Sequence, residues 1–254
     1  MSYNPYSLEG KTILVTGASS GIGKATAIEC SKLGARVIIT GRDEARLQQT
    51  LSSLEGEGHV VIAAGLGEDD GIRFLVERVP VLNGIVHAAG ISDTVLFQFL
   101  KKERLENIFN INFFAPVVLS QLLLKKKLLR KGGSIVFLSS IDGPITAHIG
   151  NSMYSATKGA LSAMMRNMSI ELASKGIRVN AVLPGMTETP LIHNDDITQE
   201  QLNKDMELYP LKRYADPREI AWAIIYLLSD ASTFTIGATL LSMEDLRFYR
   251  LWRY

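Results

Sequence analysis

The sequence of 254 residues predicts one α/β domain built around a parallel sheet of about seven strands. Three observations predict this class. Short runs rich in β-branched residues alternate with helical patterns along the chain. The runs are continuously apolar, which is typical of strands that are covered on both faces. A glycine-rich turn follows the first run and leads directly into a helical pattern.

The predicted strands follow one another at intervals that leave room for a helix after each of them. In chain order they cover residues 12–15, 37–40, 60–62, 84–86, 134–138, 179–182 and 239–241. Strands alternating with helices in this way indicate the doubly wound Rossmann fold. We find no internal repeat, low-complexity tract or linker-like change in composition, so residues 1–254 are predicted to form a single domain.

Composition and charge limit the classes of partner. The chain has 27 Lys and Arg against 26 Asp and Glu, a net charge of +1, which gives no overall field for nucleic acid or an anionic membrane. Cys30 is the only cysteine, so an internal disulfide is excluded, and a packing role in a helix is expected for it. Residues 1–10 are polar, and the longest clean apolar run, 220–228, is far shorter than a membrane span. These features predict a soluble, cytoplasmic protein.

The glycine-rich turn between the first strand and the first helix predicts a nucleotide phosphate site. Gly17 permits a tight turn, Gly21 lets the backbone approach a pyrophosphate, and Gly23 allows close helix packing. The first helical amides carry a partial positive charge that favours an anion. Further contacts at the turn are expected from Ser19, Ser20 and Ile22.

Tyr154 and Lys158 are four residues apart in a helical pattern and so lie on one helix face. A free phenol has a pKa of about 10 and is a poor base at neutral pH, whereas a nearby cation favours the phenolate. Lowering the phenol pKa by roughly three units corresponds to about 4 kcal/mol. An exposed surface pair is the alternative. The glycine-rich turn and Ser140, fourteen residues before Tyr154, favour the catalytic interpretation.

Five motifs in this order resemble the compact branch of the short-chain dehydrogenase/reductase family, and the 3-oxoacyl-(acyl-carrier-protein) reductases within it. The resemblance runs from about Leu8 to Leu241. The motifs are the turn at 16–23, Asn112, Ser140, the Tyr154 and Lys158 pair, and Pro184-Gly185.

The resemblance implies an enzyme that transfers a hydride between a nicotinamide cofactor and a carbonyl or secondary alcohol. Tyr154 would be the general acid/base, and Ser140 would bind the substrate oxygen. Lys158 would lower the pKa of Tyr154 and hold the nicotinamide ribose. Asn112 would link Lys158 to solvent as a proton relay. The alternatives are a turn residue at 140, a helix-kink residue at 112 and a surface charge at 158.

The preferred cofactor depends on the end of the second strand. Gly41 stands where the resemblance leads us to expect the acid that binds the ribose hydroxyls in NAD-preferring members. Arg42 follows with a guanidinium suited to a 2′-phosphate, which favours NADP. NAD remains the alternative, because Arg42 has possible partners in Asp43 and Glu44.

Several positions depart from the family pattern. His87 begins the sequence His-Ala-Ala-Gly where an asparagine-rich motif is usual, and it is expected to be a buried structural imidazole. Gly65 replaces the acid expected near the adenine. The remaining cofactor contacts implied by the resemblance are Leu66, Ala88, Ala89, Gly90, Pro184, Gly185, Thr187 and Thr189. The tail 242–254 is atypical of the family.

Residues 186–214 are predicted to form the substrate lid. Apolar members expected to line a pocket are Leu191, Ile192, Met206, Leu208 and Tyr209, with a solvated outer face of Glu188, Asp195, Asp196 and Glu200. Such a lid is compatible with acyl, alicyclic or steroid-like ketones as substrates, and sugars are an alternative. Lys125–131 is predicted to end a helix. Lys131 and Lys175 match the basic docking residues of the acyl-carrier-protein reductases, which favours a 3-oxoacyl substrate slightly.

The sequence is compatible with two classes of function. The first is an NADPH-dependent carbonyl reductase or alcohol dehydrogenase, and the alternative is a non-catalytic nucleotide-sensing protein that acts through a partner. A sugar-nucleotide epimerase would need a larger C-terminal domain. The family implies a homotetramer or homodimer that pairs the helices at 113–131 and 154–175. Met164, Met165 and Met168 fit either that interface or the core.

Overall fold

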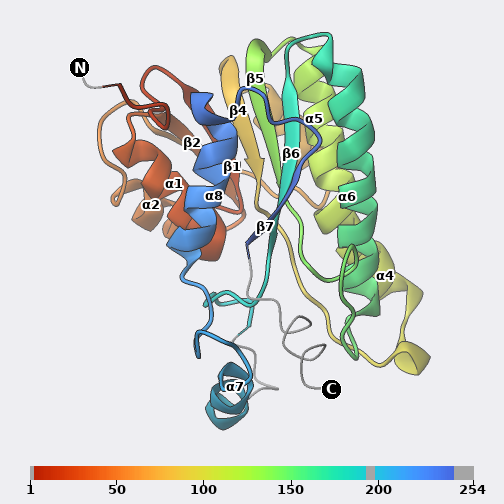
Figure 1. The fold of residues 1–254 in the computed structure, drawn as a ribbon. Coiled ribbons are helices and arrows are strands. Elements are labelled where there is room, and N and C mark those ends of the chain that lie inside the picture. The colour runs from red at the N-terminus through yellow and green to blue at the C-terminus, as the bar shows by residue number, and fades with distance from the viewer. Residues whose placement is uncertain (1–2, 193–197, 243–254) are drawn as a thin grey trace.

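The computed structural model describes residues 3–192 and 198–242, and these form an α/β domain around one seven-stranded parallel sheet (Figure 1). The strand order is β3-β2-β1-β4-β5-β6-β7, so the chain reverses its direction of winding between β3 and β4. The strands are β1 (Thr12–Thr16), β2 (Arg36–Gly41), β3 (Val60–Ala63), β4 (Leu82–His87), β5 (Leu129–Leu138), β6 (Arg178–Pro184) and β7 (Thr239–Ser242). The predicted fold class and its seven strands are confirmed.

Helices cover both faces of the sheet. On one face lie α1 (Gly21–Lys32), α2 (Glu44–Leu51) and α8 (Pro217–Leu228). On the other lie α3 (Asp69–Val76), α4 (Lys102–Phe109), α5 (Ala115–Lys125) and α6 (Ser152–Ala173). The short helix α7 (Gln199–Met206) lies beyond the carboxyl edge of the sheet (Figure 1).

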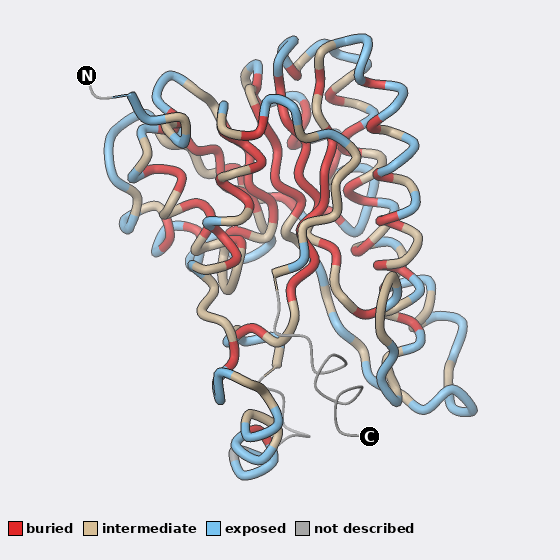
Figure 2. The backbone as a smooth tube through the Cα atoms, viewed as in Figure 1, coloured by how far each residue is buried: buried red, intermediate tan, exposed pale blue. Residues whose placement is uncertain are grey.

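The buried strands separate two hydrophobic clusters. Ile13 and Val15 of β1 pack with α1 and α8, whereas Leu14 between them packs with the helices of the opposite face. Successive side chains of a strand point to opposite faces, so a continuously apolar strand serves both layers. Figure 2 shows this buried layer through the centre of the sheet.

The start of β5 corrects the prediction that residues 125–131 end a helix. Helix α5 ends at Lys125, and β5 already begins at Leu129. Lys127 has a φ of 56°, which turns the chain sharply, and the amide of Leu82 donates to the carbonyl of Leu128 at 2.8 Å. Burial of Leu129 beside β4 therefore draws part of this basic segment into the sheet.

The segment from α4 through the π-helical turn η2 (Asn110–Phe114) into α5 is one continuous helix. Residues Lys102–Lys125 are long and apolar enough to cross a membrane by length and composition, although 39% of the most apolar window is buried inside the protein. This helix is longer than any uninterrupted apolar run of the sequence, because Asn110 and Asn112 interrupt the run without ending the helix. Its buried face packs on the sheet, as a core helix of a soluble domain also does.

The expected packing roles of Cys30 and His87 are confirmed. Cys30 is fully buried in α1. The His87 ring stacks on Phe137 at 4.8 Å between centroids, and its Nε2 lies 2.8 Å from the Ser120 hydroxyl. Burial lowers the pKa of His87 to about 3, so this imidazole is neutral at physiological pH.

Candidate active site

The glycine-rich turn packs backbone against backbone at the carboxyl ends of β1 and β4. A Cβ atom at Gly17, where φ is +65°, would lie 2.7 Å from Ala89 Cα, and a Cβ at Gly23 would lie 2.3 Å from the Gly17 carbonyl oxygen. The Thr16 hydroxyl accepts hydrogen bonds from the amides of Ala88 and Ala89, both at 3.1 Å. Only glycine fits at these two positions, and the turn is therefore fixed on the end of β4.

The opening of α1 faces the loop that follows β6. A Cβ at Gly21 would lie 3.2 Å from Thr189 Cγ2, so these two predicted cofactor residues lie beside one another. The N-cap residue Ser20 makes no side-chain capping bond, and the first turn of α1 carries no acid. Helical amides without a side-chain cap are the groups that bind an anion at a helix N-terminus.

Ser140, Tyr154 and Lys158 are brought together by the end of β5 and the start of α6. The Ser140 side chain lies near the phenol of Tyr154 and acts to lower its pKa. The Lys158 ammonium is buried, lies 5.5 Å from the centroid of the Tyr154 ring and donates to the carbonyl of Leu138 at 2.8 Å. Lys158 is therefore not a surface charge.

The two ionisable groups are both shifted by burial. Burial raises the pKa of Tyr154 to about 12; the Ser140 side chain acts against this shift and the Asp142 carboxylate adds to it. Burial lowers the pKa of Lys158 to about 8. The lowering of the Tyr154 pKa expected from Lys158 is thus not found in the protein alone, because desolvation dominates and the ammonium is directed to a backbone carbonyl.

Asn112 lies in the π-helical turn η2 and is 1% exposed. Its amide accepts from the Ile91 amide at 2.8 Å and donates to the Ile91 carbonyl at 2.9 Å and to the Thr157 hydroxyl at 3.2 Å. A Cβ at Gly90 would lie 3.3 Å from Asn112 Oδ1 and 3.7 Å from Lys158 Nζ. Asn112 therefore marks a helix distortion, as one interpretation predicted, and also lies near Lys158.

The adenosine end of the predicted cofactor site lies beyond β2. A Cβ at Gly41 would be 3.5 Å from the Ser19 hydroxyl, and a Cβ at Gly65 would be 3.9 Å from Arg42 Cγ. Asp43 caps α2 and pairs with Arg46 at 3.2 Å, so it is not the partner of Arg42. Within the described part of the chain, the exposed Arg42 forms no ion pair. Its guanidinium remains available to a ligand.

Two predicted cofactor contacts use their side chains elsewhere. Leu66 is buried in the core with Ile62 and Ile72. Thr187 is also buried, and its hydroxyl donates to the carbonyl of Gly185, which follows Pro184 at the end of β6, at 3.1 Å. Any contact of these two residues with a cofactor would therefore involve the backbone.

The lid prediction is corrected in part. Leu191 and Leu208 are exposed, and Tyr209 packs edge-on against Tyr214. Asp195 and Asp196 lie outside the described residues. Met206 borders a cavity of about 520 Å³ whose other lining residues are Glu188, Arg213, Tyr214, Asp216, Arg218, Glu219 and Trp222.

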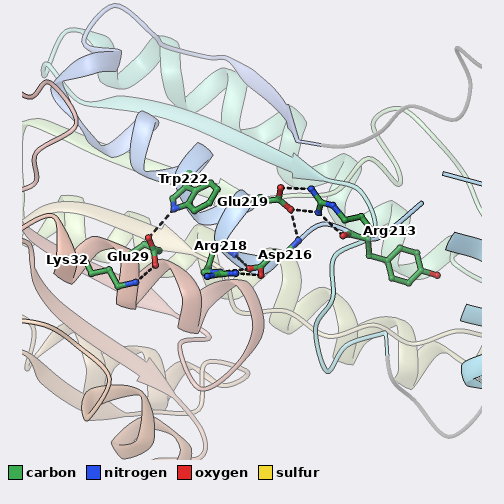
Figure 3. Close-up of polar contacts among 8 residues, drawn as sticks. Glu29, Lys32, Arg213, Asp216, Arg218, Glu219 and Trp222 are labelled. Carbon is green, nitrogen blue, oxygen red and sulfur yellow. Dashed lines mark hydrogen bonds and ion pairs between the residues drawn. The ribbon is translucent and has the colours of Figure 1, made fainter. Parts of the chain in front are cut away.

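Of the predicted apolar residues, all within the described part of the chain, Met206 alone lines that cavity, and two charge pairs make up much of the remaining wall. In Figure 3, Arg213 forms a bidentate ion pair with Glu219, and Arg218 pairs with Asp216. The Trp222 indole donates a hydrogen bond to Glu29. Because these groups neutralise one another and none of Ser140, Tyr154 or Lys158 lines the cavity, it is separate from the candidate catalytic group.

Lys131 and Lys175 lie at the amino edge of the sheet. Lys131 is near the start of β5, and its side chain contacts Gly176, the neighbour of Lys175. Ser140 follows the other end of β5, whose regular part from Ser134 to Leu138 is about 13 Å long. The two lysines therefore do not flank the candidate catalytic group of their own chain.

Two residues that lie at the site were not predicted from the sequence: Asp142 and Thr157. Thr157 holds the Asn112 amide, and buried Asp142 collects three side-chain hydrogen bonds next to Ser140. The available signal was an acid two residues after Ser140, followed by Thr, His and Asn within nine residues.

Comparisons with known proteins agree with this arrangement. The family model described as Enoyl-(Acyl carrier protein) reductase matches residues 17–242. The chain is 34% identical to a 3-oxoacyl-(acyl-carrier-protein) reductase of Rickettsia conorii, over 92% of this chain and 95% of the relative. It is 35% identical to a glucose and ribitol dehydrogenase of Daucus carota, over 92% and 84%.

A solved structure described as a short chain dehydrogenase/reductase family protein superposes with a TM-score of 0.82 at 34% identity, covering 93% of this chain and 97% of that one. Fold, motif order and sequence similarity thus extend over nearly the whole chain. The chain belongs to the short-chain dehydrogenase/reductase family, whose members are oxidoreductases acting on carbonyl and alcohol groups.

Proposed function

We propose that this protein is an NADP(H)-dependent reductase of ketones, with the reverse oxidation of secondary alcohols as the same reaction run backwards. The observation that carries the proposal is the grouping of Ser140, Tyr154 and Lys158 at the carboxyl edge of the sheet, on which the glycine-rich turn also lies. Ligands of doubly wound sheets bind at this edge, near the point where the strand order reverses.

The residues present fit a dinucleotide. The glycine-rich turn has no room for side chains at Gly17 and Gly23, and α1 begins without a side-chain cap. Arg42 is exposed next to Gly65, in the position to receive a 2′-phosphate, which favours NADP over NAD. Residues proposed to hold the cofactor are Gly17, Ser19, Ser20, Gly21, Ile22, Gly23, Arg42, Ala88, Ala89, Gly90, Tyr154, Lys158, Pro184, Gly185 and Thr189, with Leu66 and Thr187 through their backbones.

The protein's own groups supply the proton and hold the substrate oxygen. The bound nicotinamide supplies the hydride. Ser140 donates to the carbonyl oxygen, and Tyr154 gives that oxygen its proton as charge develops there. Lys158 holds the ribose, and its positive charge favours the phenolate left on Tyr154. Asn112 keeps the helix distorted beside Lys158, where a path for proton resupply begins.

The substrate class proposed is a ketone, with 3-oxoacyl thioesters as the leading candidates because of the reductase relatives. Sugars and polyols are further candidate substrates, because the relatives include a glucose and ribitol dehydrogenase and an L-xylulose reductase. We further propose a cytoplasmic homotetramer or homodimer, as the family resemblance implies.

Tyr154→Phe tests the proposal. Loss of the proton donor is expected to lower kcat by about 10²-fold to 10⁴-fold. The dissociation constant for NADPH should stay within about twofold, because the ring is retained. Turnover is followed by nicotinamide absorbance with a panel of 3-oxoacyl, alicyclic and sugar ketones, and cofactor binding by fluorescence titration. Tyr6→Phe, on the exposed N-terminal segment, is the matched control.

The second candidate is a nucleotide-sensing protein without turnover. The raised pKa of Tyr154 and the departures around Gly65 and His87 favour it. NADPH binding by the parent protein with no cofactor oxidation across the whole panel would move the assignment to this class.

A further inference from the structure

Asp142 lies two residues beyond Ser140, and its buried carboxylate holds the connection between β5 and α6. Its Oδ1 accepts from the Thr146 hydroxyl at 2.7 Å and from His148 Nδ1 at 2.6 Å, and its Oδ2 accepts from Asn151 Nδ2 at 2.8 Å. Asp142 is 5% exposed. All three donors come from residues 142–151, so one carboxylate fixes the fold of that segment at the carboxyl edge of the sheet (Figure 1).

The same residue is connected to both partners of the proposed proton transfer. The Asp142 amide donates to the Ser140 hydroxyl oxygen at 3.1 Å. Asn151, which binds the carboxylate, is also the N-cap residue of α6, and its carbonyl accepts from the Ser155 amide at 2.8 Å. Tyr154 lies in that first turn of α6. The carboxylate thus ties the Ser140 side chain to the helix turn that carries Tyr154.

Among the described residues, few other charged or titratable side chains lie near the Asp142 carboxylate. His148 contacts the carboxylate, and its side chain is 62% exposed. Tyr154 and Lys158 come from α6. Residues 93–95 lie beside the connection between β5 and α6, where the Val95 amide donates to the Gly150 carbonyl at 2.9 Å. The acid of that segment, Asp93, is paired with Arg104.

Asp142 acts on Tyr154 through space. Burial is the largest cause of the raised pKa of Tyr154, and the Asp142 carboxylate adds to it. A fixed negative charge makes a second negative charge on the phenol less favourable.

We propose that Asp142 is a positioning residue of the reaction proposed above: it holds Ser140 and the first turn of α6 in register, and it keeps Tyr154 protonated so that carbonyl reduction continues to higher pH. The inference rests on the proposed function. It assigns a role to an acid that belongs to none of the five family motifs.

Asp142→Asn separates charge from geometry. The amide keeps the size of the side chain and still accepts from Thr146 and His148, while the Asn151 amide can turn to present its oxygen. The pH at which kcat/KM for carbonyl reduction falls to half is expected to decrease by about half a unit to one unit, with little change in KM. Asp142→Ala should show the same decrease and, in addition, a loss of kcat of about tenfold, because three donors lose their acceptor.

Asp93→Asn is the matched control, because that carboxylate lies on the neighbouring segment and is already paired with Arg104. Asp93→Asn should leave unchanged the midpoint of the pH profile, the pH at which kcat/KM for carbonyl reduction falls to half. A purely structural role predicts an unchanged midpoint in Asp142→Asn together with lower kcat in Asp142→Ala, and that result would overturn the proposal.

A second readout does not need turnover. In protein labelled at the tyrosine ring carbon, the Tyr154 signal is identified by its loss in Tyr154→Phe and followed from neutral pH to about pH 11 by NMR. At a given pH, Asp142→Asn should show a larger phenolate fraction than the parent. Identical signals at every pH contradict the inference. A difference between the variants in a protein that reduces no ketone would instead leave the Asp142 effect standing and refute the proposed function.

Discussion

The proposed preference for NADP depends on a single residue. Arg42 follows Gly41 at the end of β2, is exposed, and lies beside Gly65. Its acidic neighbour Asp43 is already engaged as the N-cap of α2 and as the partner of Arg46. The alternative in which Arg42 and Asp43 neutralise one another is therefore not formed, and the case for a 2′-phosphate becomes stronger than the sequence made it.

Arg42→Ala is expected to weaken NADPH binding by about tenfold to a hundredfold, since a charge-assisted hydrogen bond contributes about 1.5–3 kcal/mol. NADH binding should change by less than about twofold. Both dissociation constants are measurable by fluorescence titration. Arg46→Ala, which removes a guanidinium engaged with Asp43, is the control. Equal losses for the two cofactors in Arg42→Ala would remove the argument for phosphate recognition.

At the scale of elements, the start of α8 is fixed by its own polar groups. Helix α8 begins with a capping box, in which Asp216 accepts from the Arg218 amide at 2.8 Å and the Glu219 carboxylate accepts from the Asp216 amide at 2.8 Å. The Arg218 side chain also pairs with Asp216 at 2.7 Å. These bonds lower the pKa of Asp216 to about 2, the Arg218 side-chain hydrogen bond contributing most.

Asp216→Ala is expected to lower the free energy of unfolding by about 1 kcal/mol at neutral pH, the usual contribution of an N-cap. The folded pKa of about 2 lies below the reference value of 3.8, so the ionised form contributes stability above about pH 4. That contribution is lost as the pH falls from about 4 towards 2, and the difference between variant and parent should shrink there. Urea unfolding at several pH values measures it.

Asp216→Asn keeps a good capping group without the charge. It should lose less stability than Asp216→Ala, and its own stability should lack the decline attributed to Asp216. A gap between Asp216→Ala and the parent that stays constant down to about pH 2 would contradict the assignment.

In the whole molecule, the two-layered core assigns roles that helical periodicity leaves open. Met165 of α6 is fully buried against the sheet, and Met168 packs against the same core, whereas Ile170 on that helix is 77% exposed. The methionine stripe at 164–168 therefore belongs to the core at least in part. Apolar residues with helical spacing pack equally well against a sheet or a second subunit, so the sequence left both alternatives open.

Met165→Ala is expected to reduce the free energy of unfolding by about 2–5 kcal/mol, because it leaves a cavity in a close-packed layer. Its elution volume on size-exclusion chromatography should match that of the parent. Ile170→Ala on the exposed face is the control and should change stability by less than about 0.5 kcal/mol. A change in assembly without loss of stability in Met165→Ala would instead place this residue in an interface.

The sequence by itself determined the fold class, the seven strands, the glycine-rich turn between β1 and α1 and the grouping of Ser140, Tyr154 and Lys158. Those predictions depend on local properties: buried strands must be apolar, tight turns need glycine, and residues four apart share a helix face. Only the tertiary structure placed Lys131 and Lys175 at the far edge of the sheet, buried Leu66, paired Asp43 with Arg46 and gathered three donors around Asp142. These outcomes depend on which elements meet across the fold and on how far burial shifts a charge, and neither can be read from spacing along the chain.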